Sequence, residues 1–346
     1  MNSSRLSVEF WPSLLRQTGC ARLRAAMFDP ASSDSESEIV SPFRAVAVFA
    51  NPASGSGRSL KLLPKIKTAF EQHGFRATIY EMASPEELEA LVRKSIAEGF
   101  THLFTFGGDG TLHNVINAAY GRDMLFGVIP SGGGNDFARA LHLPLNPLGA
   151  ISAACLGTPR PVDLVRVRFA DGTTRFYLGG GGVGLDSESA SLANSRYRNL
   201  SGRLRYVLAA VHAYLALKPQ RIRIALDDSS FGGPWQRFVL ASLLNTPTFG
   251  AGIQLSPGAR IDDGLLDYAF LPELRFGQLL RALPRLLING VLSLPNIERK
   301  QVRRVRIETE TPAYFQGDGE LMGLTPVEIE VIPRAVRFLA PKAQAG

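Results

Sequence analysis

Cysteine and histidine are scarce in this sequence, which has two cysteines and five histidines among 346 residues. Cys20 and Cys155 lie far apart and match neither a disulfide framework nor a zinc-ligand spacing. No histidine lies in a His-x-x-x-His or His/Cys pattern, which argues against a transition-metal site. We therefore expect a protein of a reducing compartment whose chemistry does not use a transition metal.

Long uninterrupted apolar runs are also missing. The longest stretches, YVLAAVHAYLAL and LLRALPRLLINGVLSL, are shorter than the roughly 18 apolar residues of a spanning helix or contain arginine and proline. Residues 1–42 have no apolar segment typical of a secretory signal and no sustained periodicity, so they are predicted to form a disordered extension. We expect a cytoplasmic protein that contacts the inner membrane face only peripherally.

The remaining composition is that of a globular protein. Hydrophobic residues make up 45% and charged residues 20% of the chain, which is enough apolar material for about two domains. The 38 Lys and Arg against 31 Asp and Glu give a net charge of +7. A positive charge suits nucleic acid, anionic lipid and phosphate-bearing ligands equally well, so the charge alone selects no function.

Strand-like and helix-like runs alternate between residues 43 and 163, which predicts βαβ units and a parallel sheet in an α/β domain. The expected strands are 45–50, 75–82, 102–106 and 125–130, and the expected helices are 60–74, 84–99 and 111–121. From residue 164 to residue 341 the pattern changes to many short strands separated by turns, with one long helix expected at 203–217. This second segment is predicted to be an antiparallel β-sandwich domain.

Three glycine-bearing loops, 51–57, 107–111 and 131–136, each follow a buried-type strand. In a parallel sheet such loops emerge from the same edge, where the following helix N-termini present N–H groups to anions. Thr111 can supply a hydroxyl there, and Asp109 can orient a ribose or a metal-bound water. The three loops together therefore predict a nucleotide-phosphate site.

Two other glycine patterns do not support a known nucleotide motif. PASGSGRS lacks the first glycine and the lysine of a Walker A loop. LGGGGVGL contains G-x-G-x-x-G, but it opens no βαβ unit and has no acidic residue at the expected distance.

A third motif, QGDGEL, places Asp318 and Glu320 on a loop between strands. The two carboxylates could face one site if Gly319 is extended, because side chains two residues apart then point the same way. Phosphoryl transfer needs a carboxylate to accept the proton of the attacking hydroxyl, and clustered carboxylates favour Mg²⁺.

Taken together, the motifs resemble the diacylglycerol kinase catalytic-domain family, and in particular its bacterial soluble lipid kinases, from about residue 44 to residue 341. GGDGT is shared with NAD kinases, whereas GGGNDFAR and the pair DDGLLD and GDGE distinguish the lipid branch. The segments that occur in the family's order and approximate spacing are NPASGSGR, FGGDGTLHNVIN, PSGGGNDFARAL, RPVDL, LSPGARIDDGLLD and GDGE.

The resemblance implies an ATP- and Mg²⁺-dependent kinase that phosphorylates diacylglycerol or a related lipid at a membrane surface and has no nucleic acid partner. Asp318 and Glu320 would lie near the acceptor hydroxyl and activate it, with Glu320 as the proton acceptor. Asp163, Asp263 and Asp318 would surround a structural magnesium, completed by main-chain oxygens of Arg260 and Leu265. The residues implied to hold ATP are Asn51, Ser54, Gly55, Gly107, Gly108, Asp109, Gly110, Thr111, Gly133 and Asn135.

Three positions depart from the family pattern: Gly133 replaces a threonine, Asn114 replaces a glutamate, and Met82 stands where a threonine is common. These changes weaken the expected nucleotide contacts and leave two alternatives open. One is a kinase of the NAD kinase type with a soluble substrate, and the other is a nucleotide- or lipid-binding regulator without turnover.

Two stretches that mix arginine with leucine and aromatic residues, 195–221 and 274–294, suit docking to a lipid surface or simply cover the β-sandwich. The sequence does not identify the acceptor lipid, and it does not decide between a monomer and a homodimer.

Overall fold

The computed structural model describes residues 44–52, 60–197, 200, 202–216, 220–227, 229, 233–250, 252–273, 277 and 297–342. The extension predicted at residues 1–42, the loop residues Ser54 and Gly55, and all of the stretch 274–294 except Gly277 lie outside the described residues. Among the described residues, no helix combines the length and the apolar character needed to cross a bilayer.

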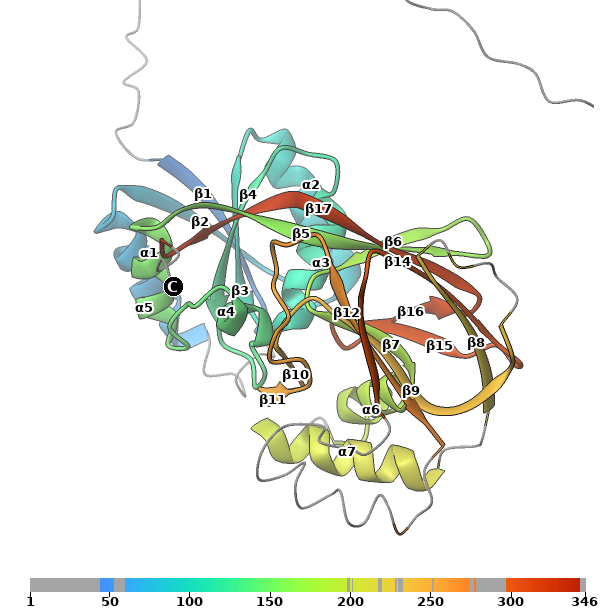
Figure 1. Cartoon of the computed structure of the whole chain (residues 1–346). Coiled ribbons are helices and arrows are strands. Elements are labelled where there is room, and N and C mark those ends of the chain that lie inside the picture. The colour runs from blue at the N-terminus through green and yellow to red at the C-terminus, as the bar shows by residue number, and fades with distance from the viewer. Residues whose placement is uncertain are drawn as a thin grey trace, which may run out of the picture. The chain divides into compact units, whose positions relative to one another are not determined.

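The first half is built on a parallel sheet, which confirms the predicted α/β architecture (Figure 1). Strands β1 (Arg44–Ala50), β2 (Phe75–Glu81), β3 (His102–Gly107) and β4 (Leu125–Pro130) lie in the order β2-β1-β3-β4. The helices that connect and follow them are α1 (Leu63–Glu71), α2 (Pro85–Ala97), α3 (Asp109–Ala119), α4 (Asp136–Ala140) and α5 (Pro147–Cys155). The predicted start of the second helix is confirmed, because Ser84 Oγ accepts a hydrogen bond from Glu87 N at 3.2 Å.

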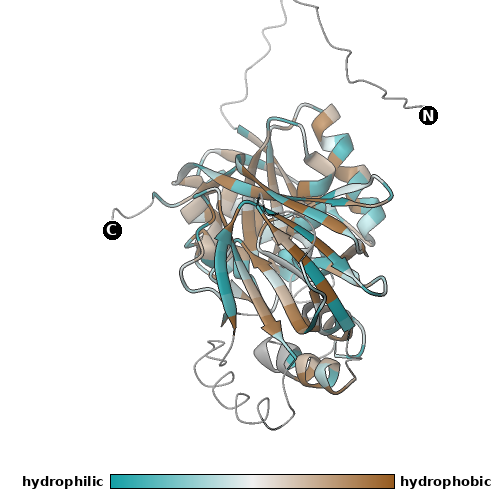
Figure 2. Ribbon diagram, turned by 45° about the vertical axis from the view of Figure 1, so that its right-hand side comes forward, coloured by the Kyte–Doolittle hydropathy of each residue, from teal (hydrophilic) through white to brown (hydrophobic). Residues whose placement is uncertain are grey.

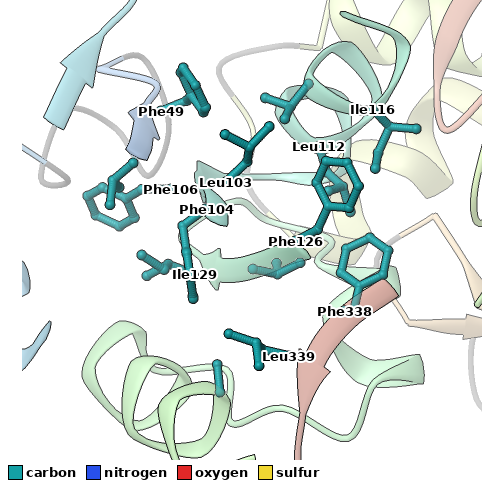
Figure 3. Packing of buried hydrophobic residues seen from close by; sticks show 14 of the residues in the cluster. Phe49, Leu103, Phe104, Phe106, Leu112, Ile116, Phe126, Ile129, Phe338 and Leu339 are labelled. Atoms are coloured by element: carbon teal, nitrogen blue, oxygen red, sulfur yellow. The ribbon is translucent and has the colours of Figure 1, made fainter. Parts of the chain in front are cut away.

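The centre of this sheet is buried because helices cover it. Phe104 and Phe106 of β3 are both fully buried, and Figure 3 shows them packed among residues from β1, β4 and α3. Each such side chain contributes about 1.5–3 kcal/mol through the apolar area it removes from water. Figure 2 shows hydrophobic and hydrophilic residues interleaved along the elements of the molecule. The packed sheet therefore supports the loops that follow its strands.

The second half consists of antiparallel strands, as predicted for a β-sandwich. Two helices, α6 (Leu185–Asn194) and α7 (Gly202–Ala216), follow β7, and α7 confirms the helix expected near residues 203–217. The longer strands are β5 (Thr158–Phe169), β6 (Thr174–Tyr177), β7 (Gly180–Gly184), β8 (Gln220–Leu226), β9 (Gln236–Leu244), β12 (Leu266–Pro272), β13 (Glu298–Val302), β14 (Arg304–Thr309), β15 (Tyr314–Gly317), β16 (Glu320–Leu324) and β17 (Val327–Ala340), and a short hairpin joins β10 (Thr248–Phe249) to β11 (Ile253–Gln254).

The last strand, β17, connects the two halves. Its first residues pair antiparallel with β14 and β5, and near its end Arg337 and Phe338 pair parallel with β4. In Figure 1 this red strand runs from the sandwich to the edge of the first sheet. The chain therefore returns to its N-terminal sheet, and the two halves share one connected set of strands.

Asp163 of β5 is fully buried and binds main-chain N–H groups from two other segments. Its Oδ2 accepts from Gly264 N at 2.7 Å and its Oδ1 accepts from Arg334 N at 2.7 Å. Burial raises the pKa of this carboxyl, while the two N–H donors oppose the rise. Asp163 therefore fixes the loop before β12 and the middle of β17 against β5.

We expect Asp163→Ala to lower the free energy of unfolding by about 2–4 kcal/mol, because it leaves two buried N–H donors without an acceptor. Urea unfolding measures the loss. Asp123→Ala is the matched control, since the Asp123 side chain is 90% exposed and its ion pair with Arg337 is worth less than about 1 kcal/mol. Equal losses in the two variants would contradict the structural role of Asp163.

Candidate functional site

The glycine loops after β1, β3 and β4 meet at the carboxyl edge of the parallel sheet. Asn51 N donates to Phe106 O and Ser131 N donates to Gly107 O, both at 3.0 Å. The Asn51 side chain also donates to Thr111 Oγ1 at 3.3 Å. The described parts of the three loops therefore form one surface.

Glycine is needed where two of these loops touch. A Cβ atom on Gly132 would lie 2.8 Å from the Cα of Gly108, so any side chain there would push the loops apart. Asn135, at φ 55°, holds the second loop in shape: its Nδ2 donates to Gly132 O at 2.8 Å and its Oδ1 accepts from Gly132 N at 3.1 Å. Gly133 is exposed at the tip of this loop.

Asp109 joins two of the loops. Its carboxylate accepts hydrogen bonds from Asp136 N and Phe137 N, both at 3.1 Å, at the start of α4. Burial and the neighbouring Asp136 carboxylate raise the pKa of Asp109 to about 7, although the two N–H donors lower it. Asp136 in turn accepts from Gly252 N at 2.7 Å, which ties α4 to the second half of the molecule.

GDGE forms the turn of the hairpin between β15 and β16. Gly317 pairs with Glu320, and the two residues between them are left-handed, with φ 55° at Asp318 and φ 87° at Gly319. The prediction of an extended Gly319 is therefore wrong, because Asp-Gly here occupies a two-residue turn that needs positive φ at both positions.

Asp318 is held by the main chain of the strand region next to it. Its Oδ1 accepts from Gly179 N at 2.7 Å, and its Oδ2 accepts from Leu178 N at 3.0 Å and lies 3.3 Å from His113 Nδ1. The Asp318 and His113 side chains are only 6% and 4% exposed. The glycine run that resembled a dinucleotide motif therefore has a different role: its first residue lets the Asp318 carboxylate approach the backbone.

The Glu320 side chain of the hairpin lies next to Gly110 of the loop after β3. A Cβ atom on Gly110 would lie 2.5 Å from Glu320 Oε1, so the carboxylate occupies space that only glycine leaves free. Burial raises the pKa of Glu320, and the Asp318 charge adds to the rise, while His113 and Arg205 oppose it. The predicted carboxylates and the predicted phosphate loop, far apart in the sequence, are therefore neighbours in the structure.

The residues implied for magnesium do not fit one shared ion. Asp163 binds Gly264 N and Arg334 N, Asp318 binds Leu178 N and Gly179 N, and Asp263 Oδ1 accepts from Leu265 N at 3.0 Å. In the part of the chain that the structure describes, no group of three or more Asp, Glu, His or Cys side chains is arranged to hold a metal. Arg260 and Leu265 therefore remain predicted ligands of a magnesium ion.

The structure also shows site residues that the sequence did not reveal. His113 lies in α3, two residues after the GGDGT motif, but nothing local indicates that it meets Asp318. Asn194 Nδ2, at the end of α6, donates to Gly319 O at 2.8 Å. Of the positions that depart from the family pattern, Met82 packs in the buried core and Asn114 is half-buried.

The arrangement suits transfer of a phosphoryl group to a hydroxyl. Closely packed glycine backbone beside the start of α3 can take up phosphate oxygens, which helix N-termini stabilise. A partly buried carboxylate with a raised pKa, placed against that backbone, is suited to accept a proton.

Comparisons with known proteins show the family of the chain. A family model described as "Diacylglycerol kinase catalytic domain" matches residues 45–167, and one described as "YegS C-terminal NAD kinase beta sandwich-like domain" matches residues 181–340. A protein of Stenotrophomonas maltophilia named "Probable lipid kinase YegS-like" is 30% identical over 74% of this chain and 84% of its own length.

Two further similarities cover more of the chain. A "Diacylglycerol kinase" of Mycobacterium tuberculosis is 28% identical over 86% of this chain and 95% of its own length. A crystal structure described as a diacylglycerol kinase from Bacillus anthracis matches with a TM-score of 0.63 at 20% identity, covering 87% of this chain and 98% of that one. At that identity the structural match shows the shared fold.

The raised pKa of Asp109 predicts a specific dependence of stability on pH. Folding holds a proton on Asp109 that the unfolded chain releases between its ordinary pKa of 3.8 and about 7, so this contribution is full at low pH and is lost as the pH rises through about 7. We expect the unfolding free energy of the wild type, minus that of Asp109→Asn, to fall over this window by at most about 1.4 kcal/mol per pH unit.

Urea unfolding at a series of pH values measures this difference. Asp171→Asn is the control, because hydrogen bonds from Thr173 lower the pKa of the exposed Asp171 below its ordinary 3.8, so the corresponding difference rises with pH only below about 3.8 and is flat over the Asp109 window. A difference for Asp109 that stays constant or rises with pH would contradict the account.

Proposed function

Because the chain belongs to the diacylglycerol kinase catalytic-domain family, we propose that it is an ATP-dependent lipid kinase. It transfers the γ-phosphate of ATP, bound with Mg²⁺, to a hydroxyl of diacylglycerol or a related lipid at a membrane surface. Phosphatidylglycerol, ceramide and sphingoid bases are further candidate acceptors, since each carries a free hydroxyl.

The donor side of the reaction is supported by the meeting of the glycine loops. Gly108 to Gly110 and Ser131 to Gly133 are at least partly exposed next to the start of α3, where the triphosphate would lie. Asn51 and Thr111 contact each other at the same edge. Asp109 orients this site indirectly, because its carboxylate fixes the position of α4 relative to α3. Ser54 and Gly55 belong to the same proposed site.

The acceptor side depends on Glu320. The lipid hydroxyl oxygen forms the new bond to the γ-phosphorus, the bond to the bridging oxygen breaks and ADP leaves, and the hydroxyl proton passes to the Glu320 carboxylate. The raised pKa of Glu320 makes its carboxylate a stronger base toward the hydroxyl proton. Asp318 does not touch the substrate in this scheme; it fixes the hairpin that carries Glu320.

The observation that supports this function most directly is the contact between Glu320 and Gly110. This contact supports a role for Glu320 as proton acceptor, because Gly110 belongs to the loop proposed to hold the transferred phosphate. Lipid recognition is supported by the names of the relatives and by the exposed leucines of α7, Leu208 and Leu215.

We expect Glu320→Gln to lower kcat by about 10²–10⁴-fold, because the amide cannot accept the proton. The test is a panel of lipids with ATP and mass-spectrometric detection of the phosphorylated product. Glu310→Gln, at an exposed position of the same half, should keep wild-type activity. Phosphorylation of NAD but of no lipid, ATP binding without any transfer, or equal turnover by Glu320→Gln would each overturn the proposal.

Gly110→Ala tests the position of the carboxylate rather than its charge. The added methyl group displaces Glu320 Oε1, and we expect kcat to fall by about 10²-fold. The melting temperature should not fall, because alanine is favoured over glycine in a helix by about 1 kcal/mol and the displaced atom is the end of a flexible side chain.

Gly258→Ala is the control for this substitution, since no atom lies within 4 Å of its added Cβ. Unchanged turnover by Gly110→Ala would show that Glu320 is not needed where the structure places it.

A further inference from the structure

Helix α7 lies on α6 through small side chains. Ala209 and Ala213 of α7 are buried, as are Ala190 and Ala193 of α6. Small residues allow two helices to approach closely, and α6 in turn contacts β7, β9, β15 and β16. Figure 1 shows α7 on the outer side of α6. Helix α6 therefore stands between α7 and the strands that carry the GDGE hairpin.

Two leucines of α7 are exposed. Leu208 and Leu215 are 37% and 64% exposed, and they lie seven residues apart, which brings them to nearly the same side of the helix. Leu200, just before the helix, is 36% exposed. The sequence around these leucines supplies Arg196, Arg198, Arg203 and Arg205, and no acidic residue occurs between residues 195 and 221.

Two side chains connect α7 to the hairpin. Arg205 donates from Nε to Ala193 O at 2.8 Å and from Nη2 to Asn194 Oδ1 at 2.7 Å. Asn194 Nδ2 then donates to Gly319 O at 2.8 Å. Gly319 is the residue between Asp318 and Glu320, so the chain of hydrogen bonds ends at the turn that places the proposed proton acceptor.

We propose that the leucine side of α7 docks on a phospholipid bilayer, and that Arg205 and Asn194 transmit this docking to the GDGE hairpin and so hold Glu320 in its working position. This inference rests on the proposed function for the chemical step that the hairpin serves. Asn194 is a positioning residue here, because it acts through Gly319 and does not touch the substrate. Arg205 holds Asn194, and its charge also lowers the pKa of Glu320.

A bilayer is the partner that fits this surface. Leucines flanked by arginines, without acidic residues, match an interface that is apolar inside and anionic at its headgroups. The net charge of +7 acts in the same direction over longer range. A lipid acceptor must also leave a bilayer to reach Glu320, so a surface coupled to the hairpin can make turnover depend on the presence of that bilayer.

The test uses Asn194→Ala, which removes the bond to Gly319 but keeps the one from Arg205 to Ala193 O. Ser195→Ala is the matched control. Among the contacts that the structure describes, the Ser195 hydroxyl bonds only to Ser191 O, at the same end of α6. Binding is measured by flotation with vesicles of phosphatidylcholine and phosphatidylglycerol. Hydrogen–deuterium exchange of the hairpin peptide 314–324 is measured with and without these vesicles.

The activity readout is the ratio of two rates, one on diacylglycerol in vesicles and one on a soluble short-chain diacylglycerol. For the wild type and Ser195→Ala we expect vesicles to slow exchange in the hairpin and to give the higher rate. For Asn194→Ala we expect wild-type flotation, no slowing of exchange, and a ratio reduced about tenfold, the size expected for one hydrogen bond to a positioned group. If Asn194→Ala lost both rates equally, or if exchange in its hairpin still responded to vesicles, the proposed connection from α7 to the hairpin would be overturned.

The docking surface has its own test in the double variant Leu208→Ser/Leu215→Ser. Its flotation should fall at least about tenfold, since two buried leucines contribute several kcal/mol to interfacial binding. Leu156→Ser, at a site 73% exposed at the end of α5, should float as the wild type. Unchanged flotation of the double variant would overturn the docking surface. If the wild type phosphorylates no lipid, the proposed function fails, whereas flotation and exchange still decide this inference.

Discussion

The carboxylate of Asp318 accepts hydrogen bonds from the main-chain N–H groups of Leu178 and Gly179, and the position of the whole GDGE hairpin depends on that contact. The carboxylate is nearly buried, so losing its donors would leave a charge without compensation. His113 brings α3 to the same carboxylate. One acidic residue thus binds the N-terminal glycine motif, the glycine run before β7 and the hairpin into a single unit, and Glu320 takes its place against Gly110 as a result.

Much of the fold follows from local pattern. Buried-type strands alternating with amphipathic helices predicted the first sheet, and short strands with turns predicted the second half. Three features were missed for physical reasons. α6 follows a run of glycines that reads as a loop, β7 is made almost entirely of those glycines, and the end of β17 pairs with β4 across most of the sequence. Such long-range pairing depends on sheet edges that exist only after the first half has folded.

In the site, too, some residues could be identified from local sequence motifs, whereas others are recognised only from contacts between distant parts of the chain. The glycine loops and the GDGE carboxylates could be found in the sequence, because close backbone approach and proton transfer restrict the residue types. Their partners could not: Asp109 binds the start of α4, Asp136 binds Gly252, and Asn194 binds Gly319. Asp163, implied as a magnesium ligand, holds two main-chain N–H groups in the structure. A carboxylate has the same appearance in a sequence whether it binds a metal, a backbone or a substrate.

We propose that the glycine loop after β3 and the Glu320 carboxylate enclose one reaction centre. The decisive experiment is a crystal structure with a non-hydrolysable MgATP analogue and a soluble short-chain diacylglycerol. We expect the γ-phosphate beside Gly107 to Thr111 and the acceptor hydroxyl about 2.6–3.2 Å from a Glu320 oxygen. A nucleotide bound away from this loop, or a hydroxyl that approaches the phosphorus from a side Glu320 does not reach, would contradict it.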